Sequence, residues 1–374
     1  MIEQIREEAR RRFAELGYPT THDEEWRFTS VAPIARTEFS PTAAPLSAQP
    51  VRAGFTIAKL SQSPVEPYLA RYANFRDNAF VALNTANFED GLFIHIAKGV
   101  IVEEPIEITI ESRANGHPTV SHPRILIVAE AGSQATIVER YRGNAGAYFT
   151  NPVTELIAGD NAVVDHYKLQ TDGANAFHVS TLQVQLGRDT NFRSHALCFG
   201  GALVRNDVNA VLSEGSECTL NGLYLVGGTQ HIDNHTAIDH AKPHAASHEL
   251  YKGILEDHSS AVFNGKIFVR KDAQKTDAKQ TNKNLVLSED AVINTKPELQ
   301  ILADDVRCTH GATIGQLDPE GIFYLQSRGI GLADARNLLV YAFARDIIDR
   351  VKVPSLRDQL EKLLLEKLHA AHRN

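Results

Sequence analysis

The sequence predicts a mainly β protein in which a stacked solenoid lies between helical ends. Short β-branched and aromatic runs alternate with Gly, Asp and Asn turns from about residue 89 to residue 325. Similar turns recur at intervals of about 30 residues, which is typical of repeat architectures. Apolar residues follow a helical period at both ends of the chain.

Residues 1–88 are expected to form an irregular, partly helical cap. A helix is predicted before Gly17 by the apolar spacing of Ile2, Ile5, Ala9, Phe13 and Leu16. The segment 24–28 holds the only Trp, and the run 41–50 is rich in Pro, Ala and Ser. That run is predicted to be an extended loop.

Residues 89–325 are expected to form the solenoid. An apolar residue followed by a short Gly- or acid-containing turn recurs at Ile127, Ile157, Leu186, Leu212, Leu255 and Leu287. Each interval has room for two or three short strands. One such unit cannot bury its own apolar face, so we expect the units to stack. The pattern leaves an antiparallel β-sandwich with coincidental turns as the alternative.

Residues 326–374 are expected to form two amphipathic helices separated at Pro354. Their apolar stripes either pack on the body of the protein or serve as the docking face of a partner. The docking residues in the second case are Leu338, Leu339, Phe343, Leu360 and Leu364.

The composition narrows the class of protein. The net charge of −8 argues against a general nucleic-acid binder, which needs a basic face. Three widely spaced cysteines do not suit a secreted disulfide framework. We find no signal peptide and no membrane-length apolar run, so a cytoplasmic location is expected. Nucleotide-binding loops, G-x-S-x-G, H-E-x-x-H and C-x-x-C are also absent, so no familiar ATPase or esterase site is predicted.

Two groups of residues are candidate metal ligands. His231, Asp233 and His235 would share a face if they lie on one strand, although histidines that are hydrogen-bonded in turns or at an interface fit the same spacing. The role of the wider His-rich stretch, 231–258, stays open. Cys308 and His310 are also two apart, and thiolate and imidazole are both iron–sulfur ligands. A buried structural Cys beside a hydrogen-bonded His is the alternative for this pair.

The same region carries several specific phrases. These include QHIDNHT at 230–236, DAQKTDA at 272–278, QTNKN at 280–284 and CTHGATIG at 308–315, with EEWRF at 24–28 near the start. With these phrases the chain closely resembles the SufB/SufD family of iron–sulfur cluster assembly proteins. The 308–313 phrase and the modest length are similar to the SufD branch.

The resemblance implies a right-handed parallel β-helix and a non-catalytic scaffold subunit of the SUF complex. It implies pairing with SufB through the β-helix cores and docking of the SufC ATPase on the C-terminal helices. A transient iron–sulfur cluster or iron would form at the SufB–SufD interface, with His310 as the main candidate ligand and Cys308 as its neighbour. Sulfur would arrive indirectly, from a cysteine desulfurase system. The resemblance leaves flavin binding and the oligomeric state of the isolated chain open.

Two other functions stay open at this point. In one, the chain forms a homodimer that serves as both SufB and SufD. In the other, it is a β-helix carbohydrate-active enzyme that uses paired carboxylates such as Asp233 and Asp239.

Overall fold

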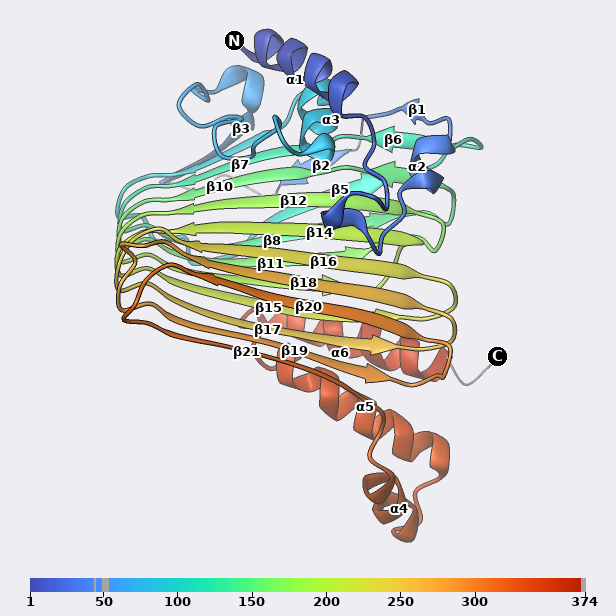
Figure 1. Ribbon diagram of the computed structural model, residues 1–374. Coiled ribbons are helices and arrows are strands. Elements are labelled where there is room, and N and C mark those ends of the chain that lie inside the picture. Colours follow the sequence, from blue (N-terminus) through green and yellow to red (C-terminus); the bar gives the residue numbers. More distant parts are fainter. Residues whose placement is uncertain (44, 49–53, 371–374) are drawn as a thin grey trace.

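The protein is a parallel β-solenoid with helices at both ends (Figure 1), which confirms the predicted fold class. The computed structural model describes residues 1–43, 45–48 and 54–370. The predicted loop at 41–50 therefore lies partly outside the described residues. None of the helices in these ranges is long and apolar enough to cross a membrane.

The described helices are α1 (Ile2–Leu16), α2 (Ala32–Arg36), α3 (Ala79–Asn87), α4 (Pro319–Ser327), α5 (Leu332–Ile348) and α6 (Pro354–Ala370), with short 3-10 turns η1 (Glu24–Trp26) and η2 (Leu60–Gln62). The strands are β1 (Ser40–Pro41), β2 (Leu46–Ala48), β3 (Phe55–Lys59), β4 (Leu92–Ile96), β5 (Ile106–Ser112), β6 (Thr119–Ser121), β7 (Arg124–Ala129), β8 (Gln134–Gly143), β9 (Tyr148–Thr150), β10 (Val153–Ala158), β11 (Val163–Thr171), β12 (Phe177–Leu186), β13 (Asn191–Cys198), β14 (Leu203–Leu212), β15 (Glu217–Val226), β16 (His231–His240), β17 (Ala246–Leu255), β18 (Ser260–Val269), β19 (Asp277–Val286), β20 (Val292–Ile301) and β21 (Arg307–Gly315).

Successive strands from β10 onward alternate between two sheets. Sheet A has the order β20-β18-β16-β14-β12-β10-β7-β4-β3, and sheet B has the order β2-β5-β8-β11-β13-β15-β17-β19-β21. All pairings are parallel except β2 with β5 and β3 with β4. Side chains alternate between the interior and the outer faces, and the Ile, Leu and Val rows of both sheets form one continuous core.

The predicted repeat of stacked units is present, but the positions assigned to it pass from sheet A to sheet B part-way along the chain. Leu186 and Leu212 end strands of sheet A, whereas Leu255 ends β17 in sheet B. The true counterpart of Leu212 is His240, its register partner on β16. Because His240 is polar, the apolar pattern skipped this position and continued at Leu255 in the other sheet. The predicted interval between Leu212 and Leu255 is therefore too long.

The two outer faces are covered by different ends of the chain. Helices α1 and α3 lie against the first coils on the side of sheet A, and α5 and α6 lie on sheet B (Figure 1). A buried ion pair between Arg124 of β7 and Glu155 of β10 fastens the cap. Glu155 also accepts hydrogen bonds from the backbone N–H groups of Ala70, Tyr72 and Ala73.

The change from strand to helix falls between Gly315 and Pro319, ahead of the predicted boundary at residue 325. The apolar and aromatic run at 322–325 has β propensity, but a helix start overrides it. Asp318 caps α4 by accepting a hydrogen bond from Glu320 N, and Pro319 occupies the first turn. Helix α4 projects beyond the last coil (Figure 1).

Candidate functional site

The two ends of the solenoid differ. At the first coils, the edge strands β2 and β3 are short, with three and five residues, and run antiparallel to the strands beside them. At the other end, β20 and β21 are edge strands and bear exposed apolar side chains. Val292 on β20 is 52% exposed and Ile314 on β21 is 54% exposed. An edge strand presents unpaired backbone groups, so this open end can accept a further strand.

Cys308 and His310 lie on β21, at this open end. Their register partners on β19 are Ala278 and Gln280, which are buried in the solenoid interior. Cys308 and His310 therefore share one face of the last strand, as the sequence predicted, and this is the interior-facing side. Cys308 is half-buried against the alanines of its coil, and burial raises the pKa of its thiol. His310 is exposed.

Behind this strand the interior is polar. Gln280 Nε2 donates a hydrogen bond to Glu249 Oε2 at 2.8 Å. The Gln280 amide crosses the interior to Gly265, where a Cβ would lie 2.2 Å from Gln280 Nε2. Burial raises the pKa of Glu249 to about 7, against weaker lowering by Thr236 and Gln280. The sequence patterns did not point to Glu249. The one local signal of this buried polar pair was Gly265, which makes room for the Gln280 side chain.

The other two cysteines do not join this group. Cys198 and Cys218 are buried in the interior of earlier coils, where burial raises the pKa of both thiols. Among the described residues, no group of three or more His, Cys, Asp and Glu side chains is arranged to hold a metal ion. Cys308 and His310 are thus a pair of potential ligands rather than a complete set.

The structure does not support the predicted metal corner at His231 and His235. The two histidines share one face of β16, as predicted, and this is the outer face. Every ring nitrogen there has a protein partner. His231 contacts Thr29 Oγ1 at 2.9 Å and Ser260 Oγ at 2.7 Å. His235 contacts Glu25 Oε2 at 3.3 Å and Asp233 Oδ1 at 3.0 Å. These histidines hold the N-terminal segment on sheet A.

Oppositely charged side chains stabilise this contact between the N-terminal segment and sheet A. The hydrogen bond from His235 is the main cause that lowers the pKa of Glu25 to about 2. Arg205 pairs with Asp233 at 2.7 Å and lies over the ring of Trp26 at 4.1 Å. Although burial opposes it, Arg205 and His235 hold the pKa of Asp233 below its usual range.

The carboxylates of the enzyme alternative are also engaged. Asp233 is buried in the network with Arg205, and Asp239 pairs with Arg270 at 2.6 Å. Paired glycosidase carboxylates must face a shared substrate cleft. Buried or paired as they are, these two carboxylates do not support a carbohydrate-cleaving site.

The predicted docking residues divide into two groups. Leu360 and Leu364 are fully buried in the cluster that seats α6 on sheet B, so their assignment to a partner's docking face is wrong. Leu339 and Phe343 are half-buried, and Leu338 is 47% exposed. The exposed apolar surface continues on Phe323 and Tyr324 of α4 and on Leu332 of α5.

Comparison with known proteins assigns the family. Residues 110–343 match the model described as "SUF system FeS cluster assembly, SufBD core domain", and residues 55–108 match the model of the SufBD N-terminal region. The chain belongs to the SufBD family. The core match contains the whole open end, including β20, β21 and the Cys308–His310 pair.

Named relatives agree with this assignment. A Synechocystis SufBD family protein is 38% identical over 296 residues, which are 76% of this chain and 65% of the relative. SufD of Escherichia coli is 34% identical over 72% of this chain and 61% of its own length. SufD of Bacillus subtilis is 28% identical over 84% of this chain and 72% of its own length. The chain thus spans less than two thirds of the first two SufBD relatives.

Proposed function

We propose that the chain is a SufD-type scaffold subunit that pairs with a SufB-like subunit through the open end of its solenoid. The observation that carries this proposal is the contrast between the short antiparallel edge strands β2 and β3 and the long, exposed edge strands β20 and β21, which have ten and nine residues. An edge of this kind gains backbone hydrogen bonds when a second strand is added. A SufB-like partner with a matching edge would extend both sheets across the interface.

In this proposal the nascent iron–sulfur cluster is cargo that forms at the interface. Cys308 and His310 provide a thiolate and an imidazole from β21, and the SufB-like partner provides the remaining ligands. Two ligands are too few to hold a cluster in this chain alone. A cluster whose ligands are divided between two subunits is released when the interface opens, which suits an assembly scaffold.

The energy source is a separate subunit in this proposal. The apolar side chains of α4 and the first half of α5 form the docking surface for a SufC ATPase, beginning at Pro319 rather than at residue 326. Phe323, which is 73% exposed, is the most prominent of them. The chain itself is non-catalytic and cytoplasmic in this proposal. Residues 1–88 cap the solenoid. Sulfur reaches the interface through the SufB-like partner.

The experiment is cluster formation in a co-expressed complex with His310→Ala. The chain, its SufB-like partner and SufC would be purified anaerobically, and iron and acid-labile sulfide would be counted. We expect the variant to assemble normally but to lose most of its cluster. His248→Ala is the matched control, because His248 is exposed on the outer face of β17. A normal cluster yield from the His310 variant would contradict the assigned ligand.

A further inference from the structure

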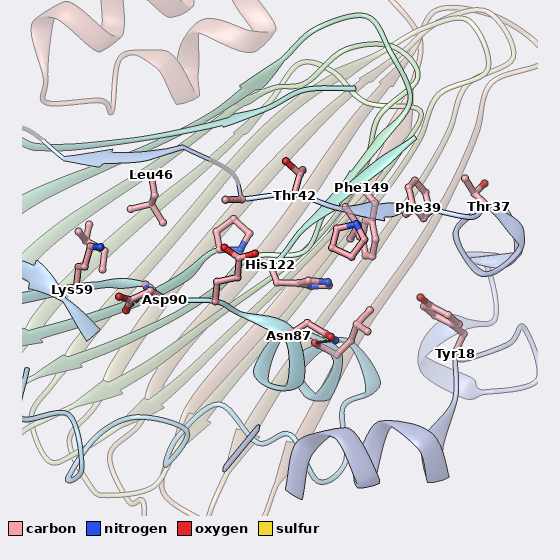
Figure 2. A pocket seen from close by; sticks show the side chains of 18 residues that line it. Tyr18, Thr37, Phe39, Thr42, Leu46, Lys59, Asn87, Asp90, His122 and Phe149 are labelled. Atoms are coloured by element: carbon pink, nitrogen blue, oxygen red, sulfur yellow. Dashed lines mark hydrogen bonds between the residues drawn. The ribbon is translucent and has the colours of Figure 1, made fainter. Parts of the chain in front are cut away.

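A pocket of about 500 Å³ lies between the cap and the first coils of the solenoid, far from the open end (Figure 2). One wall is formed by Thr37, Phe39, Pro41, Thr42, Ala43 and Leu46. The opposite wall is the C-terminal end of α3 and the loop that leads to β4. This volume is within the range of small-molecule sites in proteins.

The walls of the pocket are largely aromatic and apolar. Phe39 and Phe149 meet with ring centroids 5.9 Å apart, and Tyr18 lines the same end (Figure 2). Leu83 and Leu92 contribute further apolar surface. Rings in this arrangement offer faces and edges against which another flat ring packs favourably.

One polar atom in the pocket has a defined hydrogen-bonding role. Figure 2 shows the ring of His122 reaching into the pocket. Asn151 Nδ2 donates to Val179 O at 3.0 Å, which leaves Asn151 Oδ1 as an acceptor, 3.2 Å from His122 Nδ1. His122 Nδ1 therefore carries the proton, and Nε2 is an acceptor. Burial lowers the pKa of His122 to about 4, so the ring is neutral near pH 7.

The charged groups at the rim favour an uncharged ligand. The Asp90 carboxylate is engaged by the backbone N–H groups of Ser61 and Gly91 and by the Ser61 hydroxyl. Lys59 lies at the same rim and helps to lower the pKa of Asp90. Lys59 offsets the charge of Asp90, and the remaining carboxylate of the lining, Glu89, is exposed to solvent. This leaves the His122 acceptor as the main polar feature of the aromatic interior.

We propose that this pocket binds a small, neutral, flat aromatic molecule that donates one hydrogen bond, from an N–H or O–H group, to His122 Nε2. Phe39 and Phe149 would pack on the ring, and Asn151 would hold the His122 tautomer that makes Nε2 an acceptor. The site is separate from β21, so it does not depend on the scaffold function.

Two ring systems of nearly equal shape test the proposal on the full chain. Indole has a ring N–H, whereas benzofuran has an oxygen at the same position. We expect saturation-transfer NMR titrations to show millimolar or tighter binding of indole. Benzofuran is expected to bind about fivefold to tenfold more weakly, which is the usual effect of one hydrogen bond.

His122→Phe keeps a ring in the wall and removes the acceptor. In this variant we expect indole to weaken to the affinity of benzofuran, while benzofuran itself changes little. The comparison of the two compounds on the unmodified chain stands even if the variant does not fold. Equal affinity for indole and benzofuran, indole binding unchanged by His122→Phe, or no indole binding at millimolar concentration would overturn the proposal.

Discussion

Glu249 is a buried carboxyl that has an amide rather than a cation as its partner. Its Oε2 accepts the hydrogen bond from Gln280, while Glu249 Oε1 and Gln280 Oε1 are both buried without a hydrogen-bond partner among the described residues. A carboxylate in this position is costly, whereas a protonated carboxyl is not. Burial accordingly raises the pKa of Glu249 to about 7.

This raised pKa predicts a specific pH dependence of stability. The folded state holds the proton more tightly than the unfolded state, so the contribution is present below about pH 4.5 and is lost as the pH rises through about 7. The loss amounts to about 3 kcal/mol at most. Urea unfolding of Glu249→Gln between pH 5 and 8 should show a flatter profile than that of the unmodified chain. Identical profiles would contradict the assignment.

Glu155, unlike Glu249, is a buried carboxylate with a cation as its partner. Arg124 and backbone N–H groups of the 70–73 loop compensate its charge. Glu155→Ala would leave Arg124 buried without its counter-ion and would free the backbone N–H groups of the 70–73 loop. We expect a loss of about 3 to 5 kcal/mol in the free energy of unfolding, measured by urea denaturation. Glu111→Gln, which removes surface ion pairs with Arg113 and Arg142, is the control and should have little effect.

The two candidate ligand pairs, Cys308 with His310 and His231 with His235, show what residue spacing can and cannot predict. Spacing correctly placed Cys308 and His310 on one face of a strand, because a two-residue period is a local property. Spacing also placed His231 and His235 on one face, but it could not show that Thr29 and Glu25 would occupy their nitrogens. Partners that lie about 200 positions away in the sequence leave no local signal.

At the scale of elements, the C-terminal helices carry buried and exposed apolar side chains that hydrophobic spacing cannot separate. Leu338 and Leu360 both lie on apolar helical stripes, yet Leu338 is exposed and Leu360 is buried on sheet B. Only the position of the sheet decides which stripe is covered. The helices were thus predictable, but the division between buried and exposed apolar surface was not.

The two leucines therefore predict different outcomes. Leu360→Ala should cost about 2 to 5 kcal/mol of stability, because it leaves a cavity between α6 and the sheet. Leu338→Ala should leave the urea midpoint nearly unchanged but weaken binding of SufC, measured by isothermal titration calorimetry. A Leu338 variant that binds SufC with unchanged affinity would remove this residue from the proposed docking surface.

At the scale of the whole molecule, the recurring turns and stacked units revealed the solenoid. The sequence patterns did not reveal that the two ends of the solenoid differ. The short antiparallel edge strands at the first coils depend on the pairing of β2 with β5 and of β3 with β4. An uncovered sheet edge is a liability for an isolated protein. The open end is therefore the strongest structural argument that the chain works with a partner.

The most direct test of the proposed pairing is native mass spectrometry of the chain co-expressed with the proposed SufB-like and SufC partners. We expect one assembly that contains all three proteins. Ile314→Lys places a charge on the open edge at β21 and should abolish the SufB-like contact without unfolding the chain. Ile101→Lys, at another exposed apolar position, should assemble normally. A chain that binds neither partner, or an Ile314 variant that still binds the SufB-like subunit, would contradict pairing through the open end.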